Sequence, residues 1–246
     1  MKDFLEKTKK IFLALKNSHR YGNIIQLGYN CEAAYRFFRN YKFVDSSLFG
    51  WTFVPFENLK KALTEYDKLG NFGFDFDEPN HMFRCKHSGI LFHGKTPASS
   101  YSQHEEENKA IIENDKIELA SRIQYLKEKF LKTAKDGRTN LYIKKISKKE
   151  AENPNFREEI QWLLGYLKNL CTNDFKLLLV TEDEFYENFL FDDPQILTRS
   201  VKEYSPDEDV SNKKLGDAFG WKLIYLEFRP KYKKKNSRKL KFEEIN

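Results

Sequence analysis

The chain has few cysteines and no long hydrophobic run. Its 246 residues include only Cys31, Cys85 and Cys171, which lie far apart and cannot all pair. They give no disulfide framework, so we expect a reducing, cytoplasmic environment. The longest apolar runs, such as residues 177–180, are too short to cross a bilayer, so no membrane span is expected. The first turns mix acids and bases without an apolar stretch, and we therefore expect no secretory signal.

Several motifs that indicate cofactors or metals are also missing. The sequence contains no G-x-G-x-x-G, no P-loop and no C-x-x-C pair. Asp75-Phe76-Asp77 has the D-x-D spacing of a metal–diphosphate site, but its setting in NFGFDFDEPN favours a strand edge or a turn. There are no internal repeats. We therefore expect no cofactor and no metal.

What is present indicates a folded protein with one core. Hydrophobic residues make up 40% of the chain and aromatic residues 15%, while the 33% of charged residues include both signs. This composition is typical of a globular chain, and 246 residues suffice for one sizeable core. We expect residues 1–230 to form a single domain.

The net charge of +6 is concentrated near the C-terminus. Much of the excess lies in RPKYKKKNSRKLK, residues 229–241. We interpret residues 231–246 as a solvated basic tail, with an anionic partner of residues 231–241 (RNA, an anionic membrane or a glycan) as the alternative. Elsewhere acids and bases alternate, so specific nucleic-acid binding is not expected.

Apolar spacing predicts an α/β fold, with a mixed, partly parallel sheet flanked by helices. Helices are expected over residues 2–16, 31–39, 57–69, 107–134 and 155–169. Strands are expected over residues 23–27, 140–146, 175–181 and 221–228, with a hairpin over 82–95. The strand–helix–strand segment 140–181 predicts a C-terminal βαβ unit with parallel strands. Residues 46–56 are expected to be irregular, and residues 96–108 and 205–214 to form surface loops.

Cys31 lies where a strand is expected to turn into a helix. Gly28 can adopt backbone angles that other residues avoid, and Asn30 is a favoured N-cap that would make Cys31 the first helical residue. The N–H groups at a helix start stabilise a thiolate, which predicts a lowered pKa for Cys31. The same donors can bind the oxyanion of an acyl intermediate. The alternative is that Cys31 is a small buried residue that packs the first turn.

The segment IIQLGYNCEAAYRFFRNYKFVDSSLFGW, residues 24–51, resembles the bacterial papain-like cysteine peptidases, an uncharacterised domain family. The matching positions are Leu27, Gly28, Cys31, Ala34, Ser47, Phe49 and Trp51. His93 in LFHGK takes the place of the family histidine. The resemblance covers about the first hundred residues and implies a thiol hydrolase that cleaves a peptide or amide bond through Cys31 and His93. Gly50 and Gly94 stand where the family usually has aspartates, so this chain lacks an orienting acid at either place.

The choice of base rests on the predicted hairpin. If the hairpin turns at Ser88-Gly89, Arg84 lies opposite His93, and Cys85 and His87 point to the other face. Flanking apolar residues would partly bury His93, as suits a base; the alternative is a packed strand histidine. This register also argues against a zinc site built from the hairpin's ligand-type side chains, which are those of His81, Cys85, His87 and His93. We interpret His19 as a helix cap and His104 as a solvated residue.

Two further roles remain to be filled. A base usually has an orienting acid, and Asp217 and Asp183 are candidates because each lies near the end of a predicted strand. Gln26 precedes the cysteine by five residues and invites comparison with the oxyanion glutamine of papain-like enzymes, although a structural role in its strand is the alternative.

Two other classes of function remain open. The turn at Gly28 could receive a phosphate at a helix N-terminus, as in a glycosyltransferase-like or nucleotide-sugar-binding or glycan-binding protein without covalent catalysis. A protein that only binds a partner would explain the aromatic content and the missing acids. Of the three readings, only the thiol hydrolase assigns a reaction to Cys31.

Overall fold

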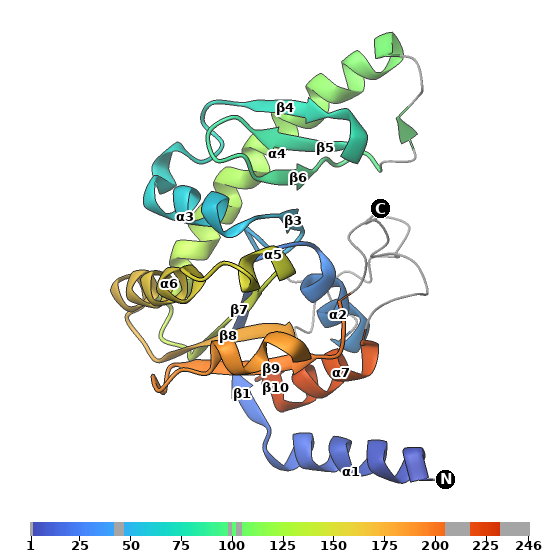
Figure 1. The fold of residues 1–246 in the computed structure, drawn as a ribbon. Coiled ribbons are helices and arrows are strands. Elements are labelled where there is room, and N and C mark those ends of the chain that lie inside the picture. Colours follow the sequence, from blue (N-terminus) through green and yellow to red (C-terminus); the bar gives the residue numbers. More distant parts are fainter. Residues whose placement is uncertain (1, 42–46, 98–99, 102–104, 205–216, 232–246) are drawn as a thin grey trace.

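The computed structural model describes residues 2–41, 47–97, 100–101, 105–204 and 217–231. It confirms the mixed α/β class, because helices flank both parallel and antiparallel strands. Figure 1 shows the antiparallel sheet against the long helix α4 in the upper half of the view, and the parallel sheet between α6 and α7 in the lower half. The helices are α1 (Lys2–Lys16), α2 (Glu32–Tyr41), α3 (Phe56–Thr64), α4 (Glu105–Ala134), α5 (Lys148–Ala151), α6 (Phe156–Leu170) and α7 (Ala218–Glu227).

The parallel sheet has the strand order β2-β7-β8-β9. Its strands are β2 (Asn23–Gln26), β7 (Asn140–Lys145), β8 (Phe175–Glu182) and β9 (Ile196–Val201). The unit β7-α6-β8 confirms the predicted βαβ crossover, with Asn140 opposite Phe175. β9 extends this sheet where we predicted no strand. A separate parallel pair, β1 (His19–Tyr21) and β10 (Phe228–Pro230), lies beside it.

The antiparallel sheet has the order β3-β6-β5-β4. Its strands are β3 (Thr52–Phe53), β4 (Phe74–Asp77), β5 (Met82–Cys85) and β6 (Leu91–His93). The hairpin β5–β6 forms as predicted, but its register is shifted by two residues, with His93 opposite Met82 instead of Arg84. The reason is a longer turn that Gly89 closes, with its N–H 2.8 Å from the Cys85 carbonyl oxygen and a φ of 74°. Because side chains alternate with period two, a shift of two keeps His93 on its predicted face.

The D-x-D segment belongs to the edge strand β4, as its sequence setting indicates. Asp75 pairs with Lys86 at 3.2 Å, and Asp77 pairs with Arg84. Both carboxylates thus have cationic neighbours on the adjacent strand and its turn.

The predicted strand over residues 221–228 is wrong, because most of this segment is helix α7. Trp221, Ile224, Tyr225 and Phe228 follow the three- and four-residue spacing of a helix face, and all four are buried. Asp217 caps the helix by accepting the Gly220 N–H at 2.8 Å. The expected loop 96–108 is also shorter, since α4 begins at Glu105. The expected loop 205–214 and residues 232–246 of the expected tail lie outside the described residues.

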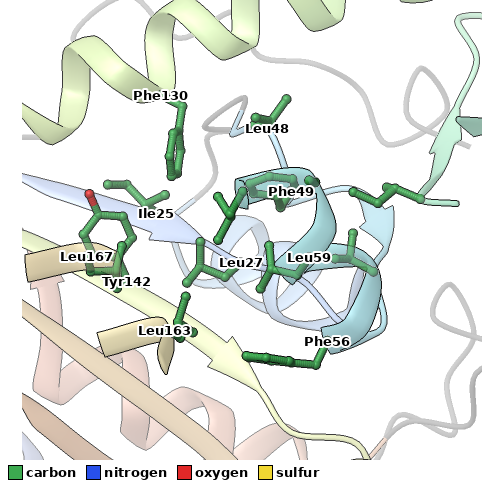
Figure 2. Close-up of a cluster of buried hydrophobic side chains, with 14 of the residues drawn as sticks. Ile25, Leu27, Leu48, Phe49, Phe56, Leu59, Phe130, Tyr142, Leu163 and Leu167 are labelled. Carbon is green, nitrogen blue, oxygen red and sulfur yellow. The ribbon is translucent and has the colours of Figure 1, made fainter. Parts of the chain in front are cut away.

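One buried cluster joins the two sheets. It includes Ile25 and Tyr142 from the parallel sheet, Phe83 and Phe92 from the antiparallel sheet, and Phe130 from α4. Figure 2 shows Phe130 and Tyr142 around Ile25, with Phe49 and Leu27 nearby. A second cluster lies on the other face of the parallel sheet, against α2 and α7. Within the described ranges, each helix is too short or too polar to cross a lipid bilayer.

Candidate functional site

Cys31 and His93 meet between the two sheets. Cys31 directly precedes α2, after the carboxyl end of β2, and His93 ends β6 of the other sheet. The Cys31 Sγ lies 3.4 Å from the His93 Nε2, although 62 residues separate them in sequence. This is within hydrogen-bonding distance for sulfur, at the edge of a parallel sheet where α/β proteins commonly build sites. The structure brings together the two residues proposed as nucleophile and base.

Backbone pairing between the sheets sets this meeting. The Val54 N–H donates to the Tyr29 carbonyl at 2.7 Å and ties the segment after β3 to the turn before Cys31. β3 in turn pairs with β6, with Thr52 opposite Phe92. The strand that carries His93 is therefore anchored, through β3, to the turn that carries Cys31.

Gly28 has the positive φ that the sequence indicates, at 74°. A β-carbon there would lie 3.1 Å from both the Phe49 carbonyl oxygen and the Val54 Cβ. The helix begins one residue later than predicted, because the Tyr35 N–H bonds to the Cys31 carbonyl at 2.8 Å. Cys31 thus takes the N-cap position predicted for Asn30, although the Asn30 Oδ1 still accepts a helix N–H, that of Glu32, at 3.1 Å. Among the described residues the Cys31 N–H meets no acceptor, so it can donate to an oxyanion.

A buried ion pair supports the start of α2. Lys145, at the end of β7, donates to Glu32 Oε2 at 2.7 Å and to Asn30 Oδ1 at 3.2 Å. Glu32 is fully buried and also accepts the Trp221 Nε1–H at 3.0 Å. Glu32 thereby joins α2, β7 and α7. Lys145 was not among the predicted site residues, although a lysine pair inside the apolar run LYIKKI is a readable signal of buried charge pairing.

Burial keeps the site neutral. It raises the pKa of the Cys31 thiol to about 12, and the Lys145 ammonium opposes this rise only in part. Burial, with the nearby Arg122 guanidinium, lowers the pKa of the His93 imidazole. The predicted lowering of the thiol pKa is therefore wrong, because desolvation outweighs the helix start and the lysine. At neutral pH the pair is a thiol beside a neutral imidazole, and the thiolate forms when the proton moves to Nε2.

Asp217 and Asp183 do not orient the base. The Asp217 carboxylate accepts the backbone N–H groups of Gly220 and Lys202, at 2.8 and 3.1 Å, at the start of α7. Asp183 is exposed at the start of the short 3₁₀ helix Asp183–Phe189. In the part of the chain that the structure describes, the His93 ring has Cys31 as its hydrogen-bonding partner and no carboxylate. Asp217 was predicted because the segment after it was expected to be a strand, but that segment is helix α7, and Asp217 caps its start.

A carboxylate does occupy the space beside Gly94. A β-carbon on Gly94 would lie 2.5 Å from Asp115 Oδ2 and 2.7 Å from Phe83 Cε2. Asp115 comes from α4, is buried, and accepts from Thr96 N–H and the Tyr101 hydroxyl. An aspartate at position 94 would therefore collide with Asp115. Gly50 likewise leaves no room for a larger residue, because a β-carbon there would lie 2.3 Å from Ser47 Oγ.

Gln26 is turned into the molecule. Its Nε2 lies 3.4 Å from the Ala33 carbonyl oxygen, and its amide also donates to the Tyr225 hydroxyl. The Gln26 amide thus links the first turn of α2 to α7, which is a structural role and not that of an oxyanion donor.

The remaining described histidines make local contacts. His19 begins strand β1 and stacks on Phe228 of β10, so its interpretation as a helix cap is wrong. His81 stacks on Tyr101, and His87 lies 3.4 Å from Glu65. His104 lies outside the described residues. No group of three His, Cys, Asp or Glu side chains within the described ranges is arranged to hold a metal ion.

Comparisons of the chain with protein-family models, with curated proteins and with solved structures found no match.

Replacing Gly28 by alanine is expected to cost at least about 1 kcal/mol more stability than replacing Gly137 by alanine. Both glycines have positive φ, 74° and 80°, but a β-carbon on Gly137 meets nothing within 4 Å, whereas Gly28 is packed. Gly137→Ala thus measures the cost of backbone strain, and the difference measures the close approach of the turn to Val54. Urea unfolding gives both values. Equal losses would contradict the packed turn.

The stability should also fall in alkaline solution because of Cys31. The unfolded thiol ionises near its ordinary pKa of 9.0, while the folded thiol, with a pKa of about 12, keeps its proton. Above pH 9 the unfolded state therefore binds fewer protons, and stability decreases as pH rises. From pH 8 to pH 10 the native protein should lose about 1.4 kcal/mol more than the Cys31→Ala variant in urea unfolding. Equal losses in the two proteins would contradict the raised pKa.

Proposed function

We propose that this protein is a thiol hydrolase of the papain-like cysteine peptidase type, which cleaves a peptide or amide bond through Cys31 and His93. The distance of 3.4 Å between Sγ and Nε2 is the observation that carries the proposal. This distance supports the pair of residues that the sequence resemblance implies. The two side chains come from segments next to different sheets, since Cys31 follows β2 and His93 ends β6.

The reaction follows from the groups at hand. The Cys31 proton moves to His93 Nε2 as sulfur attacks the carbonyl carbon, and the resulting oxyanion accepts the Cys31 N–H. The imidazolium gives its proton to the departing amine, which leaves a thioester on Cys31. A water molecule, deprotonated by His93, then attacks the thioester, releasing the acid and restoring the thiol. In this scheme the base works without a carboxylate partner, which lowers the rate but does not abolish it.

The glycosyltransferase-like alternative has less support. Its phosphate would have to bind at the start of α2, where Asn30 already caps the Glu32 N–H and Lys145 is paired with Glu32. The D-x-D carboxylates pair with Lys86 and Arg84. No observation favours this function over thiol chemistry.

Acylation by p-nitrophenyl acetate tests the proposal. This activated ester needs no specific recognition, so it reports the nucleophile and its base. We expect acetyl transfer to Cys31, detected by mass spectrometry of the Cys31 peptide, in preference to Cys171, which is also partly exposed. The thioester should be released by hydroxylamine, and Cys31→Ala should lack it. Acetylation confined to lysines, or equal labelling of Cys171, would contradict the proposal.

A further inference from the structure

Helix α4 contacts the end of β6 and the residues after it through three polar side chains in succession. The contacts are those of Arg122 with the His93 carbonyl oxygen, of Glu118 with the Lys95 ammonium at 2.8 Å, and of Asp115 with the Thr96 N–H at 3.0 Å. Positions 115, 118 and 122 are three and four residues apart, so they share one face of the helix. Residues 93–96 therefore run along this face in the direction opposite to α4, which Figure 1 shows beside the antiparallel sheet.

The first of these contacts holds the residue that carries the base. An Arg122 guanidinium N–H donates to the His93 carbonyl oxygen, while the strand pairing of β6 places His93 opposite Met82. The backbone of His93 is thus fixed both from β5 and from α4. Because the imidazole branches from this backbone, the two ties also set where its Nε2 lies, 3.4 Å from the Cys31 Sγ.

The charge of Arg122 acts on the same imidazole. After burial, this guanidinium is the second cause that lowers the pKa of His93. A nearby cation disfavours the imidazolium, and the neutral imidazole is the form that can accept the Cys31 proton. The two acids of the same helix face stabilise the guanidinium charge, and the Lys145 ammonium acts on the Cys31 side of the pair.

We propose that Arg122 is a positioning residue of the thiol hydrolase proposed above, on which this inference rests: by holding the His93 carbonyl oxygen, it keeps Nε2 beside the Cys31 Sγ. A carboxylate usually orients a catalytic histidine through its second ring nitrogen. In the described part of this chain the His93 ring has no carboxylate partner, so the tie to the backbone takes over the orientation. A displacement of about 1 Å at such a site can cost about 10²-fold in rate. Unlike a carboxylate, the guanidinium also keeps the waiting imidazole neutral.

The rate of Cys31 acylation by p-nitrophenyl acetate tests the tie to the backbone. Arg122→Met keeps the aliphatic stem but removes the N–H donors and the charge, and it should lower the rate above the pKa of His93 at least about fivefold. The stronger base left by the loss of the cation would by itself raise this rate less than about twofold, so a fall in rate reports position. Arg122→Lys retains a cation with N–H donors and should recover most of the rate. Lys116→Met is the matched control, because Lys116 belongs to the same helix but pairs with Glu113 at 2.6 Å, and it should react as the native protein does.

An NMR titration of the His93 Cε1–H signal in the full chain tests the effect of the charge without any reaction. The signal is assigned by its absence in His93→Ala. In Arg122→Met the pKa of His93 should rise by about half a pH unit, because the cation no longer disfavours the imidazolium. The pH at which the acylation rate reaches half its maximum should rise by the same amount. Arg122→Lys should titrate as the native protein does.

The two measurements distinguish failure of this role from failure of the proposed function. A native protein that is not acetylated at Cys31 contradicts the hydrolase itself, and the role of Arg122 with it. Acetylation of Cys31 at equal rates in the native protein and in Arg122→Met overturns the role of Arg122 alone, and so does an unchanged His93 titration. A loss of rate that Lys116→Met shares, or that Arg122→Lys does not recover, assigns Arg122 to general support of the fold and also overturns it. The Arg122 side chain is exposed, so the variants should fold, which circular dichroism and the urea midpoint check.

Discussion

Replacing His93 by alanine is expected to lower the rate of Cys31 acylation by p-nitrophenyl acetate at pH 7 at least about tenfold. Burial raises the thiol pKa to about 12, so almost no thiolate exists at neutral pH unless a base accepts the proton. The His93 Nε2, 3.4 Å from Sγ, is the base within reach. Mass spectrometry of the Cys31 peptide over time gives the rate.

The pH profile distinguishes a base from a residue that only supports the fold. In the native protein the rate should be nearly constant above the pKa of His93, which burial lowers below its ordinary value of 6.5. In His93→Ala the rate should instead rise about tenfold per pH unit, as expected for a free thiolate with a high pKa.

His87→Ala is the control, because His87 belongs to the same hairpin but contacts Glu65 and Phe72. It should leave both the rate and the profile unchanged. An unaltered rate in His93→Ala would remove the base from the mechanism.

Replacing Lys145 by methionine is expected to cost about 3–5 kcal/mol of stability. The Lys145 and Glu32 side chains are exposed by 1 and 0%, and their 2.7 Å contact takes place without solvent. Removing the ammonium leaves the buried Glu32 carboxylate without its closest cation, with the Trp221 N–H at 3.0 Å and the Arg36 guanidinium at 3.7 Å as described partners. The free energy of unfolding in urea measures the effect.

The exposed pair Lys60–Glu159 provides the matched control. Its side chains are exposed by 40 and 31% at a similar contact distance of 2.9 Å, so Lys60→Met should cost only about 0–1 kcal/mol. The double variant Glu32→Gln/Lys145→Met should recover part of the loss, because glutamine has no charge and can still accept the Trp221 N–H. A Lys145→Met variant no less stable than Lys60→Met would contradict the dependence of the buried Glu32 carboxylate on the Lys145 ammonium.

Local sequence determined most of the helices and strands, and it also determined the turn that precedes Cys31. The apolar strand before Gly28, the helix start after Asn30 and the βαβ unit from Asn140 onward depend on spacing and turn chemistry within a few residues, and the structure has them close to their predicted bounds. The positive φ of Gly28 follows from the same kind of local requirement. Alternation along β6 likewise fixed the face of His93, even though the turn length shifted the register.

Tertiary structure decided what these elements meet. The segment from Trp221 became helix because its apolar residues pack on the parallel sheet with helical spacing, and this moved Asp217 to a helix cap, away from the base. The thiol pKa depends on how much of the protein surrounds Cys31, which no local pattern reports. The contact of Cys31 with His93 and the pairing of Lys145 with Glu32 join residues 62 and 113 positions apart. Such distances are set by the sum of all packing contacts, so the sequence could name candidate residues, while only the fold could pair them.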